Sequence, residues 1–304
     1  MVLVNYLLMS LIFGTTYLVI KIGIDAGAPP LFSAGIRFLL AGSILFFWMM
    51  LGKRKVRLSL LFRKEMFLIG AGMTFGVFAT LYWAEQYLSS GVAAVLSAPA
   101  PLMILLIQSR ISRQKLSITD WSGCIVGSVG VILLLLPGIT ISISTLWILG
   151  CIAILIGLVG YSAGAIYSRR VIQRFEDTSP IALNAVQMMY GGGMLLILSL
   201  LTEDVQLTSL LAPNAILSLL YLMVVGSMMG HTIFYWLVAK TNPVFPTTWL
   251  YISPLIALIL GMMLYDEPLS FLSVIGGILI IFGIILVNMN SLRQLAGKKT
   301  TLQQ

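Results

Sequence analysis

The sequence predicts an all-α integral membrane protein, with ten transmembrane helices that form two five-helix repeats of inverted topology. Three observations predict this class: an apolar composition, ten apolar stretches long enough to cross a bilayer, and basic residues gathered in alternate loops. The 304 residues are 59% hydrophobic and only 9% charged, and the mean hydropathy is +1.04. A chain with so little polar surface cannot fold as a water-soluble globule, so we expect lipid to be its solvent.

Each span is predicted from the length of its apolar stretch. A bilayer core of about 30 Å needs about 20 mostly apolar residues in a helix, because each residue advances about 1.5 Å. Apolar residues run continuously instead of alternating, which favours helices over strands. The first stretch has no basic segment before it and no small-residue cleavage site after it, so we interpret it as a span. The predicted spans are residues 3–24, 31–51, 66–87, 91–110, 118–137, 146–168, 181–201, 213–238, 244–264 and 271–290.

The charges of the loops predict the orientation. The loops after spans 2, 4, 6 and 8, together with the C-terminal tail, contain 16 of the 18 lysines and arginines. By the positive-inside rule, these loops and both termini face the cytoplasm. This topology accounts for the net charge of +8. The lipid bilayer is therefore an expected partner, and nucleic acid is not.

An internal repeat relates the two halves of the chain. A shift of 153 residues aligns spans 3–5 with spans 8–10 without a gap. Because five spans separate equivalent segments, the two halves enter the membrane in opposite directions. We predict one repeat at residues 1–138, a second at 139–290, and a short basic cytoplasmic tail at 291–304. Inverted repeats are typical of secondary transporters, although channels can contain them too. The most informative matches pair Tyr82 with Tyr235, Trp83 with Trp236, Pro101 with Pro254, Gly123 with Gly276 and Gly130 with Gly283.

Three short motifs stand out: Phe13-Gly14 with downstream Lys21 in span 1, Ile36-Arg37-Phe38 in span 2, and Glu267-Pro268-Leu269 before span 10. They resemble motifs of EamA-type members of the drug/metabolite transporter superfamily. The first is similar to the family's Trp-Gly opening, and the second is similar to its Arg-Phe element. Glu267-Pro268-Leu269, followed by two glycines, resembles its signature at the last loop and span. Phe13 replaces the usual Trp, and Gln114 stands where Glu is expected. The resemblance implies a basket-like bundle that opens alternately to each side, export of amino acids, other metabolites or toxic compounds, and a bacterial inner membrane.

Ionisable residues inside a bilayer are costly, so each one is a candidate for function. Arg37 lies about six residues into span 2 from the outer side, where it is expected to bind a carboxylate or to pair with Glu85. A permanent structural pair, or snorkelling to the headgroups, is the alternative. Lys21 is four residues before Asp25, so an exposed helical ion pair competes with substrate contact.

Glu85 shares a face of span 3 with Phe78 and Tyr82, because spacings of three and four residues bring side chains together. A carboxylate there could bind an amine or carry a coupling proton. It could equally be the structural partner of Arg37 or Lys21, since all three are predicted in the outer half of the membrane.

Several uncharged side chains complete the predicted translocation pathway. His231, the only histidine, lies one turn before Tyr235 and could exchange protons near neutral pH. Gln187, with Asn184 on the same face, could bind a polar solute, and Tyr17, Tyr161 and Trp249 could stack on an apolar one. For each of these residues, hydrogen bonding or packing between helices is the alternative interpretation.

Prolines and glycines predict where helices bend and where they pack closely. Pro99, Pro101 and Pro254 remove backbone donors inside predicted spans, so they are candidate hinges or fixed kinks. Pairs of glycines in GxxxG spacing permit close helix approach. We assign them to packing within one chain and expect a monomer. The pairs are Gly72/Gly76, Gly123/Gly127, Gly160/Gly164 and Gly226/Gly230.

The motifs of other function classes are missing from the sequence. Cys124 and Cys151 lie in separate apolar stretches without a metal-ligand pattern, and no phosphate-binding loop is present. No catalytic constellation is apparent, so we expect neither an enzyme nor a cofactor. The predicted function is export of a small metabolite by alternating access, with a proton gradient as one candidate driving force. The alternatives are an uptake permease, a passive channel and, last, an intramembrane enzyme.

Overall fold

Apolar helices make up nearly the whole computed structural model. It describes the backbone of residues 1–52, 56, 58–113, 117–138, 144–253, 255–256 and 270–300, and no strand occurs within them. Eight helical segments there are long and apolar enough to cross a membrane, and a shorter apolar helix covers Phe271–Val287. The all-helical class is therefore confirmed. The second part of the predicted ninth span, 257–264, lies outside the described residues, as do Pro254, Gln114, the Glu267-Pro268-Leu269 motif and part of the basic loops.

The described segments follow the predicted spans closely. Five of them are single helices: α1 (Val2–Asp25), α2 (Pro30–Leu51), α7 (Ile118–Leu135), α8 (Thr145–Arg174) and α9 (Pro180–Thr202). The last helix, α14, covers Phe271–Thr300. Short pieces are η1 (Leu58–Phe62), η3 (Leu136–Gly138), η4 (Leu207–Leu211) and α12 (Val244–Thr247).

Three spans are interrupted within the membrane. Two contain a π-helical stretch between α-helices: α3 (Lys64–Ile69), η2 (Gly70–Gly76) and α4 (Val77–Ala84), then α10 (Pro213–Tyr221), η5 (Leu222–His231) and α11 (Thr232–Lys240). The third is broken between α5 (Ser90–Ser97) and α6 (Ala100–Ser112). Pro99 is the N-cap of α6 and Pro101 lies in its first turn, which is where a proline costs a helix least.

Local sequence signals explain several helix boundaries. Ser117 and Asp120 form a capping box at the start of α7, and Ser179 caps α9 directly before Pro180. The α2 N-terminus is capped from a distant segment, because both oxygens of the Glu203 carboxylate accept backbone N–H bonds, from Leu31 at 2.8 Å and Phe32 at 2.9 Å. A carboxylate is favourable there, at the positive end of the helix dipole.

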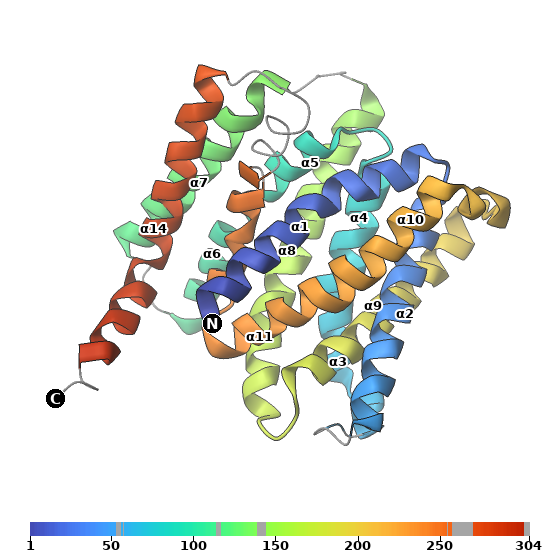
Figure 1. Ribbon diagram of the computed structural model, residues 1–304, viewed down its shortest axis with the longest axis horizontal. Helices are drawn as coiled ribbons and strands as arrows, with labels where there is room; N and C mark the ends of the chain where they lie inside the picture. Colours follow the sequence, from blue (N-terminus) through green and yellow to red (C-terminus); the bar gives the residue numbers. More distant parts are fainter. Residues whose placement is uncertain are drawn as a thin grey trace.

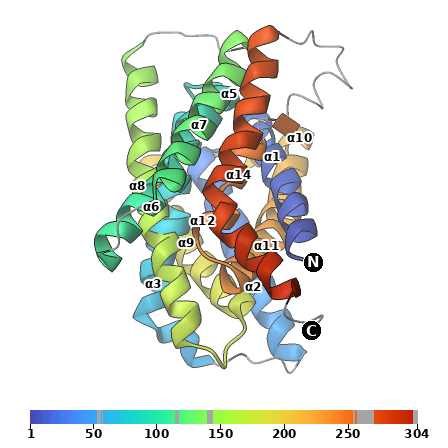
Figure 2. The same cartoon turned by 90° about the vertical axis from the view of Figure 1, so that its left-hand side faces the viewer.

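Two helix pairs form opposite sides of the bundle. In Figure 1, α7 and α14 lie side by side on the left, α2 and α9 lie together on the right, and α1 with α10 and α11 crosses the front. Figure 2 shows the α7–α14 pair from its own side. Glycines allow both pairs to approach closely: a Cβ on Gly123 would lie 2.6 Å from the nitrogen of Val287, and one on Gly35 would lie 2.7 Å from the Leu196 side chain. Small residues at such contacts are typical of membrane helices.

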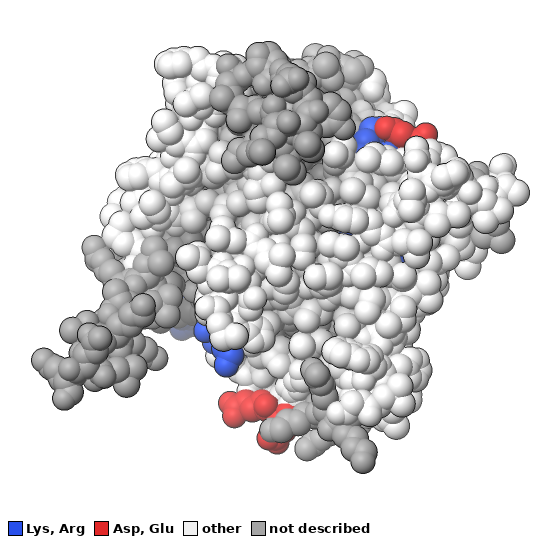
Figure 3. Space-filling model, viewed as in Figure 1, with Lys and Arg blue, Asp and Glu red and all other residues white. Residues whose placement is uncertain are grey.

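The outer surface of the bundle fits a lipid environment. Figure 3 shows charged side chains near the two ends of the molecule, with a broad uncharged band between them. Large apolar side chains such as Phe47, Ile156 and Leu200 are exposed on the helices. Exposed apolar surface of this extent would aggregate in water but is suited to contact with acyl chains.

Candidate transport site

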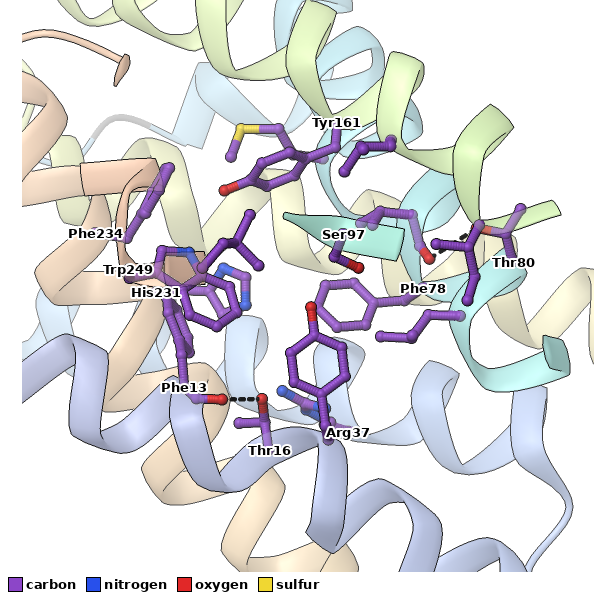
Figure 4. A pocket seen from close by; sticks show the side chains of 17 residues that line it. Phe13, Thr16, Arg37, Phe78, Thr80, Ser97, Tyr161, His231, Phe234 and Trp249 are labelled. Carbon is purple, nitrogen blue, oxygen red and sulfur yellow. Dashed lines mark hydrogen bonds between the residues drawn. The ribbon is translucent and has the colours of Figure 1, made fainter. Parts of the chain in front are cut away.

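A central cavity lies between helices that come from both halves of the chain. The empty space between its lining atoms is about 710 Å³, a figure that includes the open space at its mouth. Figure 4 shows side chains from several helices converging on this space. The lining residues are Phe13, Thr16, Tyr17, Arg37, Met73, Val77, Phe78, Thr80, Leu81, Ser97, Ile154, Leu158, Tyr161, His231, Phe234, Trp249 and Leu250.

Arg37 supplies a buried positive charge to the cavity, with only 1% of the residue exposed. Its Nε donates to the Ser227 hydroxyl at 2.8 Å, and its Nη1 donates to the Tyr82 hydroxyl at 3.0 Å. The guanidinium carbon also lies 4.6 Å from the ring centre of Phe38 and 5.3 Å from that of Phe78. Hydroxyl and aromatic groups therefore hold the cation, and among the described residues no ion pair joins it to a carboxylate.

His231 belongs to an aromatic cluster on the wall of the cavity. Its ring centre lies 5.2 Å from Phe13, 5.5 Å from Phe38 and 5.9 Å from Phe78. Edge-to-face contacts of this kind stabilise a packed aromatic wall. Because η5 carries His231 and α2 carries Arg37, the wall joins helices from the two predicted halves.

Trp249 presents a buried hydrogen-bond donor without an acceptor at normal geometry. Its ring packs 4.7 Å from Phe13 and 6.2 Å from Tyr17. The indole Nε1 has no partner at normal hydrogen-bond geometry; the Tyr161 hydroxyl points toward it (Figure 4) and makes at most a weak hydrogen bond with it. An orphan donor next to a cavity is a place where a ligand acceptor gains a bond without displacing a protein partner.

Lys21, Tyr82 and Glu85 do not line this cavity. The Lys21 ammonium is 2.8 Å from a carboxylate oxygen of Asp25, and it donates to the main-chain oxygen of Glu85 at 3.1 Å. Glu85 is completely buried, and neither oxygen of its carboxyl group has a hydrogen-bond partner. The alternative of an Arg37–Glu85 pair is not realised in this conformation.

Comparison with known proteins identifies the family of this chain. The model of the EamA-like transporter family matches residues 1–136 and 148–289. The chain belongs to the EamA-like transporter family. It is 31% identical over 287 residues to the inner membrane transporter YedA of Escherichia coli, with 92% of this chain and 88% of YedA covered. The chain is therefore a multi-pass membrane transporter.

Other relatives and a solved structure extend this result. Protein PecM of Dickeya dadantii is 28% identical, over 96% of this chain and 94% of PecM. Transporter YoaV of Bacillus subtilis is 23% identical, over 93% of this chain and 95% of YoaV. A crystal structure with 16% identity superimposes with a TM-score of 0.75 and covers 96% of this chain and 97% of its own. The last comparison establishes the shared fold alone.

Two predicted pathway residues of this EamA-family chain lie away from the cavity and bond other helices. Gln187 accepts a bond from Thr74 at 2.8 Å and donates to Asn184 at 3.0 Å, which ties α9 to η2. The Tyr235 hydroxyl donates to the sulfur of Met73 at 3.6 Å. In this conformation both side chains have the packing role that the sequence left open as their alternative.

The cavity also contains residues that were not predicted as pathway members. Thr16, Ser97 and Thr80 add hydroxyls, whereas Phe13 and Phe234 extend the aromatic wall. One sequence signal could have identified part of this set. Phe13, Thr16 and Tyr17 are three and four residues apart, so they share a face of span 1.

Proposed function

We propose that this EamA-family transporter exports small metabolites that combine a carboxylate with an apolar body, such as amino acids or related amphipathic compounds. Transport would proceed by alternating access across the cytoplasmic membrane. The observation that carries the proposal is the buried guanidinium of Arg37, which faces an aromatic cavity without an acidic partner among the described residues.

The charge of the cavity favours an anionic group on the solute. A buried cation without a counter-charge is unfavourable, and a carboxylate can accept two parallel bonds from a guanidinium. The unsatisfied indole N–H of Trp249 adds a second donor. No Asp or Glu occurs among the residues that line the cavity, so no carboxylate there would pair with an isolated amine.

The walls of the cavity favour a solute with an apolar or aromatic body. Phe13, Phe78, Phe234 and Trp249 give it flat apolar surfaces, and the hydroxyls of Thr16 and Ser97 are spaced between them. Small-molecule pockets commonly combine such apolar walls with a few polar groups that fix orientation. A purely polar solute would lose hydration on these walls without compensation.

Reciprocal contacts between α7 and α14 support ten helices in two inverted repeats. Gly123 lies against Val287, and Gly276 lies against Leu134. The two contacts are equivalent under the shift of 153 residues, because Gly123 corresponds to Gly276 and Leu134 corresponds to Val287. Gly130 and Gly283 behave in the same way, because they meet Ile280 and Gly127. Contacts of residue i with j and of j with i are the signature of a two-fold axis.

Two further features support the same halves. The π-helical stretch η2 (Gly70–Gly76), shifted by 153 residues, falls within η5 (Leu222–His231). The two stretches that the family model matches, 1–136 and 148–289, nearly coincide with the predicted repeats 1–138 and 139–290, which leaves 291–304 as a cytoplasmic tail. The cavity then lies at the repeat interface, where alternating-access transporters bind solutes.

A panel of matched solutes tests this function. Purified protein in proteoliposomes is assayed for counterflow of L-phenylalanine, phenylacetate and phenethylamine, which share an aromatic ring but differ in their charged groups. We expect saturable counterflow for the two carboxylates and none for the amine. Transport of phenethylamine alone would overturn the carboxylate assignment, and bond cleavage without transport of any compound would overturn the transporter mechanism.

The direction of transport requires intact cells. Cells that express the protein are loaded with phenylalanine by feeding a phenylalanine dipeptide, which intracellular peptidases cleave. Export predicts faster loss of phenylalanine than from cells with the Arg37→Gln variant. Faster accumulation of external phenylalanine, with unchanged loss, would indicate uptake instead.

A further inference from the structure

Glu85 is a buried acid that the solute site does not use. It follows the last residue of α4, has no exposed surface, and has two carboxyl oxygens without a hydrogen-bond partner. Glu65 provides the contrast, because it is also buried, at 3% exposure, yet it accepts a bond from Arg174 at 3.0 Å. Glu85 is therefore unlike an acid that is retained for a structural ion pair.

No group around Glu85 forms a hydrogen bond with its carboxyl group, although Lys21 and Asp25 are close enough to interact with it electrostatically. From α1, the Lys21 ammonium binds the carboxylate of Asp25 and only the main-chain oxygen of Glu85. Tyr17 of α1 and Tyr82 of α4 lie close enough to Glu85 to interact electrostatically. Where α8 packs on this end of α4, its Gly150 is in contact with apolar side chains. The cation that could neutralise Glu85 is thus nearby but occupied.

Such an environment suits a carboxylic acid rather than a carboxylate. An ionised carboxylate that is buried without hydrogen bonds or a paired charge costs far more than its neutral form. We infer that Glu85 is an exchangeable proton site of this transporter, occupied in the present conformation and vacated when its end of the bundle opens to water. The inference rests on the proposed function, because it gives the transport cycle its coupling ion.

The neighbours of Glu85 also show how the site can release its proton. When water reaches the carboxyl group, the proton leaves from Oε to water and the carboxylate remains. Lys21 can then form an ion pair with that carboxylate. Asp25 can lose its contact with Lys21, because its side chain is 59% exposed and water can solvate it. Re-protonation from the other side restores the present arrangement, so one proton is carried in each cycle.

Tyr82 links the proton site to the solute site. It lies three residues before Glu85 on the same helix face, and its hydroxyl accepts the bond from Arg37 Nη1 at 3.0 Å. A solute carboxylate that binds Arg37 competes with Tyr82 for this donor. Solute binding can therefore alter the surroundings of Glu85 without touching it.

Infrared spectroscopy tests the protonation of Glu85 without any solute. The purified protein is reconstituted at neutral pH in ether-linked lipid, which has no ester carbonyl of its own, and the carbonyl band of a protonated carboxylic acid is recorded for wild type, Glu85→Gln and Glu65→Gln. We expect the band in wild type, its loss in Glu85→Gln and its persistence in Glu65→Gln, which removes a buried but ion-paired acid. Absence of the band from wild type overturns the inference even if a variant fails to fold.

Counterflow and accumulation then separate the proton site from the solute site. With phenylalanine as the probe, Glu85→Gln should retain counterflow and lose the accumulation that a pH gradient drives in wild type. Loss of counterflow in the folded variant would make Glu85 a solute ligand, and an unchanged pH-driven accumulation would remove it from coupling. If wild type transports no solute of the panel, the proposed function fails while the infrared result still stands on its own.

Discussion

Arg37 and Glu85 are two buried ionisable residues in neighbouring helices, and their surroundings differ completely. Arg37 receives two hydroxyl acceptors and two aromatic faces, so its environment maintains the charge while offering no counter-ion. Glu85 receives no hydrogen bond at its carboxyl group, so its environment favours the uncharged form. The comparison indicates that one site is prepared for a ligand anion and the other for a proton.

The largest expected effect follows from removing the charge of Arg37. In Arg37→Gln, we expect the affinity for phenylalanine to fall about 10- to 100-fold, because hydrogen bonds to charged groups contribute about 1.5–3 kcal/mol. Arg37→Lys should fall between wild type and this variant, since lysine keeps the charge but loses the planar fork. The measurement is the solute concentration at half-maximal counterflow.

Arg174→Gln is the matched control for that experiment. Arg174 also pairs with a hydrogen-bond acceptor, but its side chain is 70% exposed at the end of α8, far along the chain from the cavity residues of that helix. Its removal should leave the counterflow affinity unchanged. Equal losses in both variants would mean that Arg37 acts on folding or surface charge and not on the solute.

The link through Tyr82 is the next prediction. Tyr82→Phe removes the hydroxyl that accepts the bond from Arg37 and leaves the ring in place. We expect the affinity in counterflow to stay within about tenfold of wild type, because a bound solute carboxylate replaces this hydroxyl as the acceptor of the Arg37 bond, while the pH gradient drives less accumulation. Undiminished coupling in this variant would show that Arg37 and Glu85 operate independently.

A smaller effect is expected on the stability of the protein when either buried glutamate, Glu65 or Glu85, is replaced by glutamine. Glu65→Gln weakens a pair whose arginine is largely exposed, so the loss should be about 1 kcal/mol or less. Glu85→Gln should cost nothing measurable at neutral pH, because an amide replaces a neutral acid of similar shape. Thermal unfolding in detergent provides the comparison, and a greater loss for Glu85→Gln would mean that its carboxylate is ionised and paired.

Sequence reasoning predicted the helices better than the contacts between them. Span 1 was expected at 3–24 and is observed as Val2–Asp25, because bilayer thickness and apolar length determine a membrane helix almost by themselves. The position of Arg37 within the second span was predicted from the same apolar length. Its partners did not, since Ser227 lies 190 residues away in the chain and only the packing of α2 on η5 brings the two together.

The predicted site residues that do not line the cavity have the same explanation. Gln187 was interpreted either as a ligand for a polar solute or as a bond between helices, and in this conformation it accepts a bond from Thr74. Periodicity shows which side chains share a face of one helix, but not which neighbouring helix that face meets. Phe78 illustrates the converse, because it was noted on the face of Glu85 yet its ring lies against Arg37 and His231.

The last prediction concerns the indole N–H of Trp249. Trp249→Phe keeps an aromatic wall against Phe13 and Tyr17 but removes the indole N–H, which has no acceptor at normal hydrogen-bond geometry in the protein. We expect the affinity for phenylalanine to fall about two- to tenfold, the contribution of a typical hydrogen bond. Trp236→Phe, on α11 and outside the lining of the cavity, is the control. An affinity loss for phenylacetate as large as that for phenylalanine would place the bond at the solute carboxylate beside Arg37, whereas a loss for phenylalanine alone would place it elsewhere on the solute.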